Sequence, residues 1–260
     1  MRDTLVTRLR AAGCVFAEQE ATLLIAAANS DPTYLDQLAT ARAHGTPLEQ
    51  LLGWVEFAGL RLSVSAGVFV PRQRTLHLLD RALGELRRIP AERTRTFVEA
   101  FAGVAPLAAA VSDNLRDVRV LACDRDQRAL RCSSSNLGDR GAVCQSNVLN
   151  GIPETYRHGV DVIAAVPPYV PDGDLGLLPR EARDYEPLSA LCGGVDGLDW
   201  IRALIREAAE HIAPGGLLLI ELSERQLESA AEYGRSRGWQ PEHTVQPDDS
   251  LTTVLALRAG

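Results

Sequence analysis

The sequence contains no lysine, because all 27 basic residues among its 260 residues are arginine. This absence excludes a Schiff-base mechanism and a lysine nucleophile. The sequence also lacks a run of about 18 consecutive apolar residues, which a membrane-spanning helix needs. Its first residues, MRDTLVTRLRAAG, lack the apolar segment of a secretory signal. We therefore expect a cytoplasmic protein that makes no membrane contact.

Cysteine is scarce and scattered, and no two of the five cysteines form a C-x-x-C pair. Such spacing does not provide a zinc site or a redox motif, so we predict reduced, mostly buried thiols and no metal. Basic charge is also in deficit. The net charge of −7 and the pI near 5.3 exclude the basic face that a general nucleic-acid-binding protein presents.

The length of 260 residues indicates one domain large enough for an enzyme, with a smaller module attached to it. Apolar residues recur at helical spacing near the N-terminus, and they alternate on both sides of Ser65-Ala66-Gly67, which predicts a β-hairpin with its turn there. We therefore divide the chain into a helical cap (1–58), a β-hairpin with a linker helix (59–90) and an α/β domain (91–260).

Short apolar runs alternate with helical patterns from Thr96 onward. This alternation predicts a mostly parallel sheet with helices on both faces. The last two runs, joined through Pro247-Asp248-Asp249, predict an antiparallel hairpin at the end of the sheet. Ligands of such sheets bind at the carboxyl ends of the strands, so the segments TFVEAFAGVA, VLACDRD and DVIAAVPPYVP are the candidates for the site.

Five ordered segments carry a family resemblance. They are residues 47–75, VPPYVP at 166–171, EARDYEP at 181–187, GGVDGLD at 193–199 and APGGLLLIELSERQ at 213–226. Together they resemble the HemK/PrmC glutamine-N5 methyltransferases, in particular a branch related to the release-factor methylases. The resemblance covers nearly the whole chain. It implies a class I, Rossmann-like methyltransferase fold for S-adenosylmethionine (SAM).

The resemblance also implies a SAM site, which this chain changes. The family's D-x-G-x-G-x-G turn reads EAFAGVA at 99–105 and keeps only one of the three glycines. A side chain at positive φ costs about 1–2 kcal/mol, and the Phe101 ring would also fill space used by the methionine part. We therefore expect a vestigial SAM site that consists of Glu99, Phe101, Gly103, the ribose acid Asp124, and Asn147, which replaces an Asp near the adenine.

The family's N-P-P-Y motif is altered as well, and reads Val166-Pro167-Pro168-Tyr169. In the family, the Asn side chain and a Pro carbonyl accept the two amide protons of the substrate glutamine. Valine has no acceptor, so a buried amide would lose a hydrogen bond worth about 1–3 kcal/mol. The remaining three residues are either substrate contacts or a structural wall.

Two arginines, Arg72 and Arg74, lie where cap and core meet, and the family has an acidic residue at the place of Arg74. We expect them to bind an anionic group, although surface ion pairing is the alternative. The predicted substrate-binding residues are Arg72, Arg74, Phe101, Val166, Pro167, Pro168 and Tyr169. The predicted catalytic residues are Glu99, Asp124, Tyr169 and Glu181.

Because both halves of the ancestral site changed together, we favour a SAM-independent biosynthetic enzyme of specialised metabolism. It would catalyse intramolecular displacement by an amine with loss of an anionic leaving group, forming a small nitrogen ring such as an aziridine. Its substrate would be a small-molecule amine, free or carrier-bound, with an anionic group, and it would need no cofactor. The alternatives are a SAM-dependent protein glutamine or amine N-methyltransferase, and a non-catalytic binding subunit with a protein partner.

Overall fold

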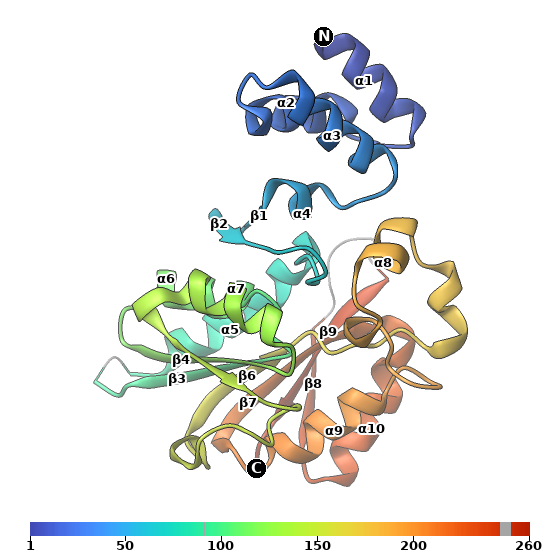
Figure 1. Ribbon diagram of the computed structural model, residues 1–260. Coiled ribbons are helices and arrows are strands. Elements are labelled where there is room, and N and C mark those ends of the chain that lie inside the picture. The colour runs from blue at the N-terminus through green and yellow to red at the C-terminus, as the bar shows by residue number, and fades with distance from the viewer. Residues whose placement is uncertain (91, 245–250) are drawn as a thin grey trace.

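The computed structural model describes residues 1–90, 92–244 and 251–260, and shows a helical cap above a larger α/β domain (Figure 1). The cap helices are α1 (Arg2–Ala11), α2 (Ala17–Ala28), α3 (Pro32–Ala43) and α4 (Leu48–Leu52). Their apolar faces form a hydrophobic core of their own around Leu9 and Leu24, which are both fully buried. Asp31 begins α3 by accepting the backbone N–H groups of Thr33 and Tyr34.

A short hairpin connects the cap to the main domain, and it lies earlier in the chain than predicted. Strand β1 (Trp54–Phe57) pairs with β2 (Leu60–Ser63). Ala58 and Gly59 form the turn at φ 51° and 76°, the left-handed conformation that two-residue hairpin turns require. The predicted turn at 65–67 is therefore wrong, and the hairpin begins inside the segment assigned to the cap. The alternation misled because Val68 and Val70 are buried without belonging to a strand.

The main domain contains a seven-stranded sheet with the order β5-β4-β3-β6-β7-β9-β8. Strands β3 to β7 run parallel, and β9 pairs antiparallel with both β7 and β8. This arrangement confirms the predicted fold class and the C-terminal hairpin, although Pro247-Asp248-Asp249 lies outside the described residues. The strands are β3 (Arg95–Ala100), β4 (Val118–Asp124), β5 (Ala142–Gln145), β6 (Val160–Ala165), β7 (Ile212–Ser223), β8 (Gln240–Thr244) and β9 (Thr252–Arg258).

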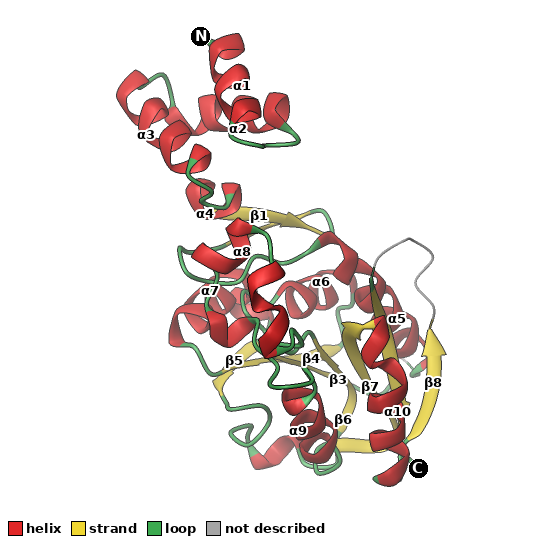
Figure 2. Cartoon of the chain, turned by 90° about the vertical axis from the view of Figure 1, so that its right-hand side faces the viewer, coloured by secondary structure: helices red, strands yellow, loops and turns green. Residues whose placement is uncertain are grey.

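Helices cover both faces of the sheet (Figures 1 and 2). Successive residues of β3 point to opposite faces, so Phe97 packs in one apolar cluster and Val98 in the other. No helix in the described part of the chain is long and apolar enough to span a membrane. The first face carries α5 (Leu76–Arg88), α6 (Pro106–Asn114) and α7 (Gln127–Leu137), and the second carries α9 (Asp199–Ala208) and α10 (Leu227–Ser236).

The strand order reverses between β3 and β6, because the chain leaves β3 toward β4 and leaves β6 toward β7. In open α/β sheets this point forms a crevice at the carboxyl ends of the strands, where ligands bind. The short helix α8 (Arg180–Tyr185) belongs to the long connection after β6 and lies between this edge of the sheet and the cap (Figure 1).

Candidate functional site

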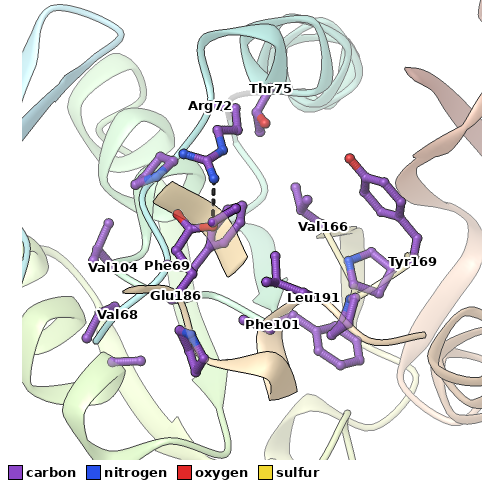
Figure 3. A pocket seen from close by; sticks show the side chains of 18 of the residues that line it. Val68, Phe69, Arg72, Thr75, Phe101, Val104, Val166, Tyr169, Glu186 and Leu191 are labelled. Atoms are coloured by element: carbon purple, nitrogen blue, oxygen red, sulfur yellow. Dashed lines mark hydrogen bonds and ion pairs between the residues drawn. The ribbon is translucent and has the colours of Figure 1, made fainter. Parts of the chain in front are cut away.

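A cavity of about 700 Å³ opens at this crevice, between the sheet, the cap and the segment that contains α8. Its walls come from the segment 68–75, the turn after β3, the end of β4, and the segments 166–170 and 178–191. Figure 3 shows Arg72 and Glu186 on one side of the cavity, and Val166 and Tyr169 on the other. The volume lies within the range of about 300–1,000 Å³ that is usual for small-molecule sites.

The turn after β3 has left-handed backbone at alternate positions. The φ angles are 53° at Phe101, 57° at Gly103 and 59° at Ala105. These are the three places where the resemblance implies glycine. The backbone therefore keeps a glycine-like conformation although two of the positions carry side chains, and each of these costs about 1–2 kcal/mol.

The Phe101 side chain lines the cavity and packs edge-on against Trp200 of α9. The two ring centroids lie 6.1 Å apart, and the planes are inclined by 70°, a geometry that aromatic pairs prefer. The contact with Trp200 holds the ring at the wall of the cavity, so Phe101 narrows the site from a defined position.

Two predicted acids are bound to backbone N–H groups. Both carboxylate oxygens of the buried Glu99 accept from the first turn of α6, one from Leu107 at 3.3 Å and one from Ala108 at 2.6 Å. Burial raises the pKa of Glu99 to about 8, against the lowering effect of these N–H groups. Glu99 thus caps a helix that starts without a side-chain cap at Ala105.

Asp124 ends β4 and lies at the centre of the site. Its Oδ2 accepts the N–H of Gly103 at 2.8 Å, and its Oδ1 accepts the N–H of Asp126 at 2.9 Å. Burial raises the pKa of this carboxyl group. A carboxylate has about four acceptor positions, so Asp124 retains capacity for a ligand hydroxyl. Asn147 is exposed and does not line the cavity, so it lies apart from the other predicted SAM-site residues.

The segment after β6 forms the opposite wall. Pro167 and Pro168 are buried, Val166 and Tyr169 are partly buried, and all four line the cavity. The backbone carbonyl of Tyr169 accepts from the Gln226 side chain at 2.8 Å. Its hydroxyl accepts from Nη2 of Arg74 at 2.9 Å, and burial raises the pKa of this phenol. The structure thus places these four residues together on one wall of the cavity.

Each of the two predicted anion-binding arginines already has a buried acidic partner. Arg72 donates to Glu186 at 2.6 Å, and burial raises the pKa of Glu186. Arg74 donates to the fully buried Glu221 at 3.3 Å, and Glu221 also accepts from the Thr75 hydroxyl at 2.8 Å. The rim that the sequence predicts to be basic is therefore locally neutral. Sequence reasoning did not pair these glutamates with the arginines, and did not select Thr75.

Glu181 lines the cavity, but its carboxylate forms an ion pair with Arg42 of the cap at 2.6 Å. Arg42 is buried and also binds Glu20 at 2.6 Å. Nearby, the Tyr185 hydroxyl donates to the carbonyl of His44 at 3.1 Å. Glu181 therefore joins the segment over the cavity to the cap, and this contact does not place it in a chemical role.

Comparison with known proteins gives a consistent result. The chain is 36% identical over 226 residues to a release factor glutamine methyltransferase of Deinococcus radiodurans, covering 84% of this chain and 77% of that protein. It is 32% identical over 214 residues to the 4-amino-L-phenylalanine/4-methylamino-L-phenylalanine methyltransferase of Streptomyces pristinaespiralis, covering 80% and 73%. No protein-family model matches the chain.

Among solved structures, a methyltransferase from Pyrococcus furiosus superposes with a TM-score of 0.56 at 16% identity. The match covers 90% of this chain and 99% of that one, and supports the fold.

The two sequence relatives are both named as methyltransferases, so the prediction of a SAM-independent displacement enzyme is wrong. The predicted aziridine product and cyclase activity are withdrawn with it. The structure supplies the physical reasons. The turn keeps left-handed φ angles at Phe101 and Ala105 although neither residue is glycine. The backbone conformation of the SAM turn is therefore retained. The positive charges of the two arginines, which were expected to stabilise a leaving anion, are neutralised. Glu186 pairs with Arg72, and Glu221 pairs with Arg74.

Proposed function

Since the chain belongs to the HemK/PrmC family of release factor glutamine methyltransferases, we propose that it is a SAM-dependent N-methyltransferase whose acceptor is an amine rather than a glutamine amide. The observation that carries this proposal is Val166, which lines the cavity where the resemblance implies an Asn acceptor. An amide nitrogen needs its protons held to orient it, and Val166 offers no such contact. The lone pair of an amide nitrogen is delocalised into the carbonyl group, whereas that of a neutral amine stays on the nitrogen. An amine can therefore attack the methyl group without that contact.

The backbone of the turn and the carboxylate of Asp124 fit SAM, although the Phe101 ring narrows the cavity. The turn from Phe101 to Ala105 retains its left-handed positions, so its backbone remains able to approach the methionine part closely. Asp124 faces the same cavity with unused acceptor positions for the ribose hydroxyls. When bound, SAM supplies an electrophilic methyl group. Asn147 lies on the surface, so we assign it no contact with the adenine.

The remaining walls would position the acceptor. Pro167 and Pro168 are rigid and buried, and with Val166 they exclude water from the nitrogen. Tyr169 is fixed at both ends, by Gln226 at its carbonyl and by Arg74 at its hydroxyl. An amine held in line with the methyl group gains rate because its orientation is fixed before reaction.

The substrate class that we propose is a small molecule with an amine, which agrees with the Streptomyces relative, whose name describes methylation of an amino-substituted phenylalanine. The test is transfer of a labelled methyl group from SAM, with 4-amino-L-phenylalanine and a release factor as parallel acceptors, together with calorimetric titration of S-adenosylhomocysteine. We expect binding of the latter and labelling of the amine. Labelling of a release-factor glutamine alone, or absence of nucleoside binding, would contradict the proposal.

A further inference from the structure

Two cysteines that lie 21 residues apart in sequence face each other in the sheet. Cys123 of β4 pairs directly with Cys144 of β5 in the parallel register. Neighbouring strands lie about 4.7–4.9 Å apart, and directly paired residues point to the same face of the sheet. This separation falls within the Cα–Cα range of about 4.4–6.8 Å that a disulfide spans.

The two thiols interact with each other. The neighbouring Cys123 side chain lowers the pKa of Cys144 to about 7. The Cys144 side chain, together with burial, raises the pKa of Cys123. In its thiol form Cys144 donates to the Gly151 carbonyl at 3.0 Å, so its side chain has a defined position.

The environments of the two sulfurs suit different roles. Strand β5 is the edge of the sheet, next to β4 (Figure 2), and Cys144 on it is partly exposed. Cys123 is fully buried directly beside it. An accessible thiolate next to a second thiol is the arrangement in which oxidation of the first cysteine is followed by disulfide formation with the second.

The other three cysteines lack this arrangement. Cys14 and Cys132 are buried. Cys192 is partly exposed, but it donates to Asp172 at 2.8 Å, and this contact raises its pKa. Cys192 is therefore a natural control for simple exposure of a thiol.

We propose that Cys123 and Cys144 form a site of reversible oxidation by a peroxide. The Cys144 thiol ionises, its thiolate attacks one oxygen of hydrogen peroxide, and the O–O bond breaks, so that Cys144 becomes a sulfenic acid. The released hydroxide takes up the proton that the Cys144 thiol lost and leaves as water. The sulfur of Cys123 then attacks the sulfur of Cys144, the S–O bond breaks, and the hydroxyl group leaves with the Cys123 proton as a second water. The two thiols lose two electrons in total, and the peroxide takes them up.

The site borders the cavity without belonging to it. The carbonyl of Cys123 accepts the N–H of Ala102 in the turn after β3 at 2.9 Å, and Asp124 follows at once. Beyond Cys144, the N–H of Ser146 donates to the carbonyl of Asp124 at 3.0 Å. A disulfide between Cys123 and Cys144 would therefore join β4 and β5 next to Asp124, whose backbone these two strands hold in place.

The test treats the folded, full-length chain with about one equivalent of hydrogen peroxide, followed by tryptic mass spectrometry without reduction. Because trypsin cleaves after arginine, Cys123 falls in peptide 120–125 and Cys144 in peptide 141–157. We expect these two peptides to be cross-linked, with loss of two thiols and of about 2 Da. Dithiothreitol should reverse the change.

Three variants make the outcome decisive. Cys144→Ser, at a partly exposed position, should fold normally and lose the cross-link, and Cys123→Ala should lose it too. Cys192→Ser should behave like the unmodified protein. The proposal fails if Cys144 is converted only to a sulfinic acid, if Cys192 reacts first, or if the urea-unfolded chain forms the same cross-link equally fast. None of these readouts depends on methyl transfer.

Discussion

Ala105 takes the same left-handed conformation as Phe101, four residues before it, with φ angles of 59° and 53°. Neither residue has glycine's freedom there, so the turn that borders the cavity is strained twice. Strain of this kind persists only where the surrounding structure enforces it. Here β3, the Glu99 contact with α6 and the Asp124 contact with Gly103 hold the turn.

Replacing Ala105 with glycine should therefore stabilise the protein. Relief of the positive φ contributes about 1–2 kcal/mol, and the greater freedom of glycine in the unfolded chain removes about 0.5–1 kcal/mol. We expect a net gain of about 0.5–1 kcal/mol in the free energy of unfolding, measured with urea. Ala109→Gly, inside α6, is the matched control and should cost about 1 kcal/mol. If Ala105→Gly does not increase the free energy of unfolding, the turn carries no strain at this position.

Val166→Asn should shift acceptor preference toward the glutamine amide. The added side-chain carbonyl supplies the hydrogen bond that a buried amide otherwise loses, worth about 1–3 kcal/mol. We expect kcat/KM for a release-factor glutamine to rise about tenfold or more, as measured by labelled methyl transfer. Val195 is a highly exposed loop residue. The variant Val195→Asn is therefore the control, because it makes the same substitution outside the cavity. Equal rates for both variants would remove Val166 from substrate selection.

Glu99 should make stability depend on pH. Burial raises its folded pKa to about 8 from a usual value of 4.5, so between these values the folded protein holds a proton that the unfolded chain releases. Stability from this group is therefore lost as pH rises through that window. Glu99→Gln has no such proton, so its free energy of unfolding should gain on the unmodified protein from pH 5 to pH 8. Parallel curves for Glu99→Gln and the unmodified protein would contradict this assignment.

Glu181→Gln should leave turnover almost unchanged, although the sequence predicts a catalytic role. Its carboxylate binds Arg42 and is about half exposed, and exposed ion pairs contribute about 0–1 kcal/mol. We expect kcat to stay within about twofold by that reasoning. Arg42→Met is the contrasting variant, because it leaves Glu20 buried without its cation and should cost about 3–5 kcal/mol. A hundredfold loss of kcat in Glu181→Gln would restore the catalytic assignment.

The elements of the fold were predictable because their signals are local. The run that ends at Asp124 is a strand, and helix α7 follows it directly, in the alternation that the apolar pattern predicts from Thr96 onward. The partners of the arginines were not predictable in this way. Glu186 and Glu221 lie 114 and 147 residues from Arg72 and Arg74, and the sequence contains no signal for pairs so far apart.

The same limit applies to the cysteines and to the hairpin. The spacing of Cys123 and Cys144 matches no motif, and only the register between β4 and β5 brings them together. The hairpin turn was misplaced because apolar alternation continues past it, and Ala58-Gly59 is a weaker signal in sequence than Ser65-Ala66-Gly67. Local patterns thus predict the elements, whereas contacts across the sheet decide the chemistry of the site.

The separate apolar core of the cap has an evolutionary consequence. The residues of that core all come from the cap, so substitutions there can accumulate without matching changes beneath the sheet. Polar links between Arg42 and Glu181 and between Tyr185 and His44 join α8 to the cap. A lineage can therefore exchange or remodel the cap, and with it the entrance that a substrate meets, while the machinery at the strand ends is inherited intact.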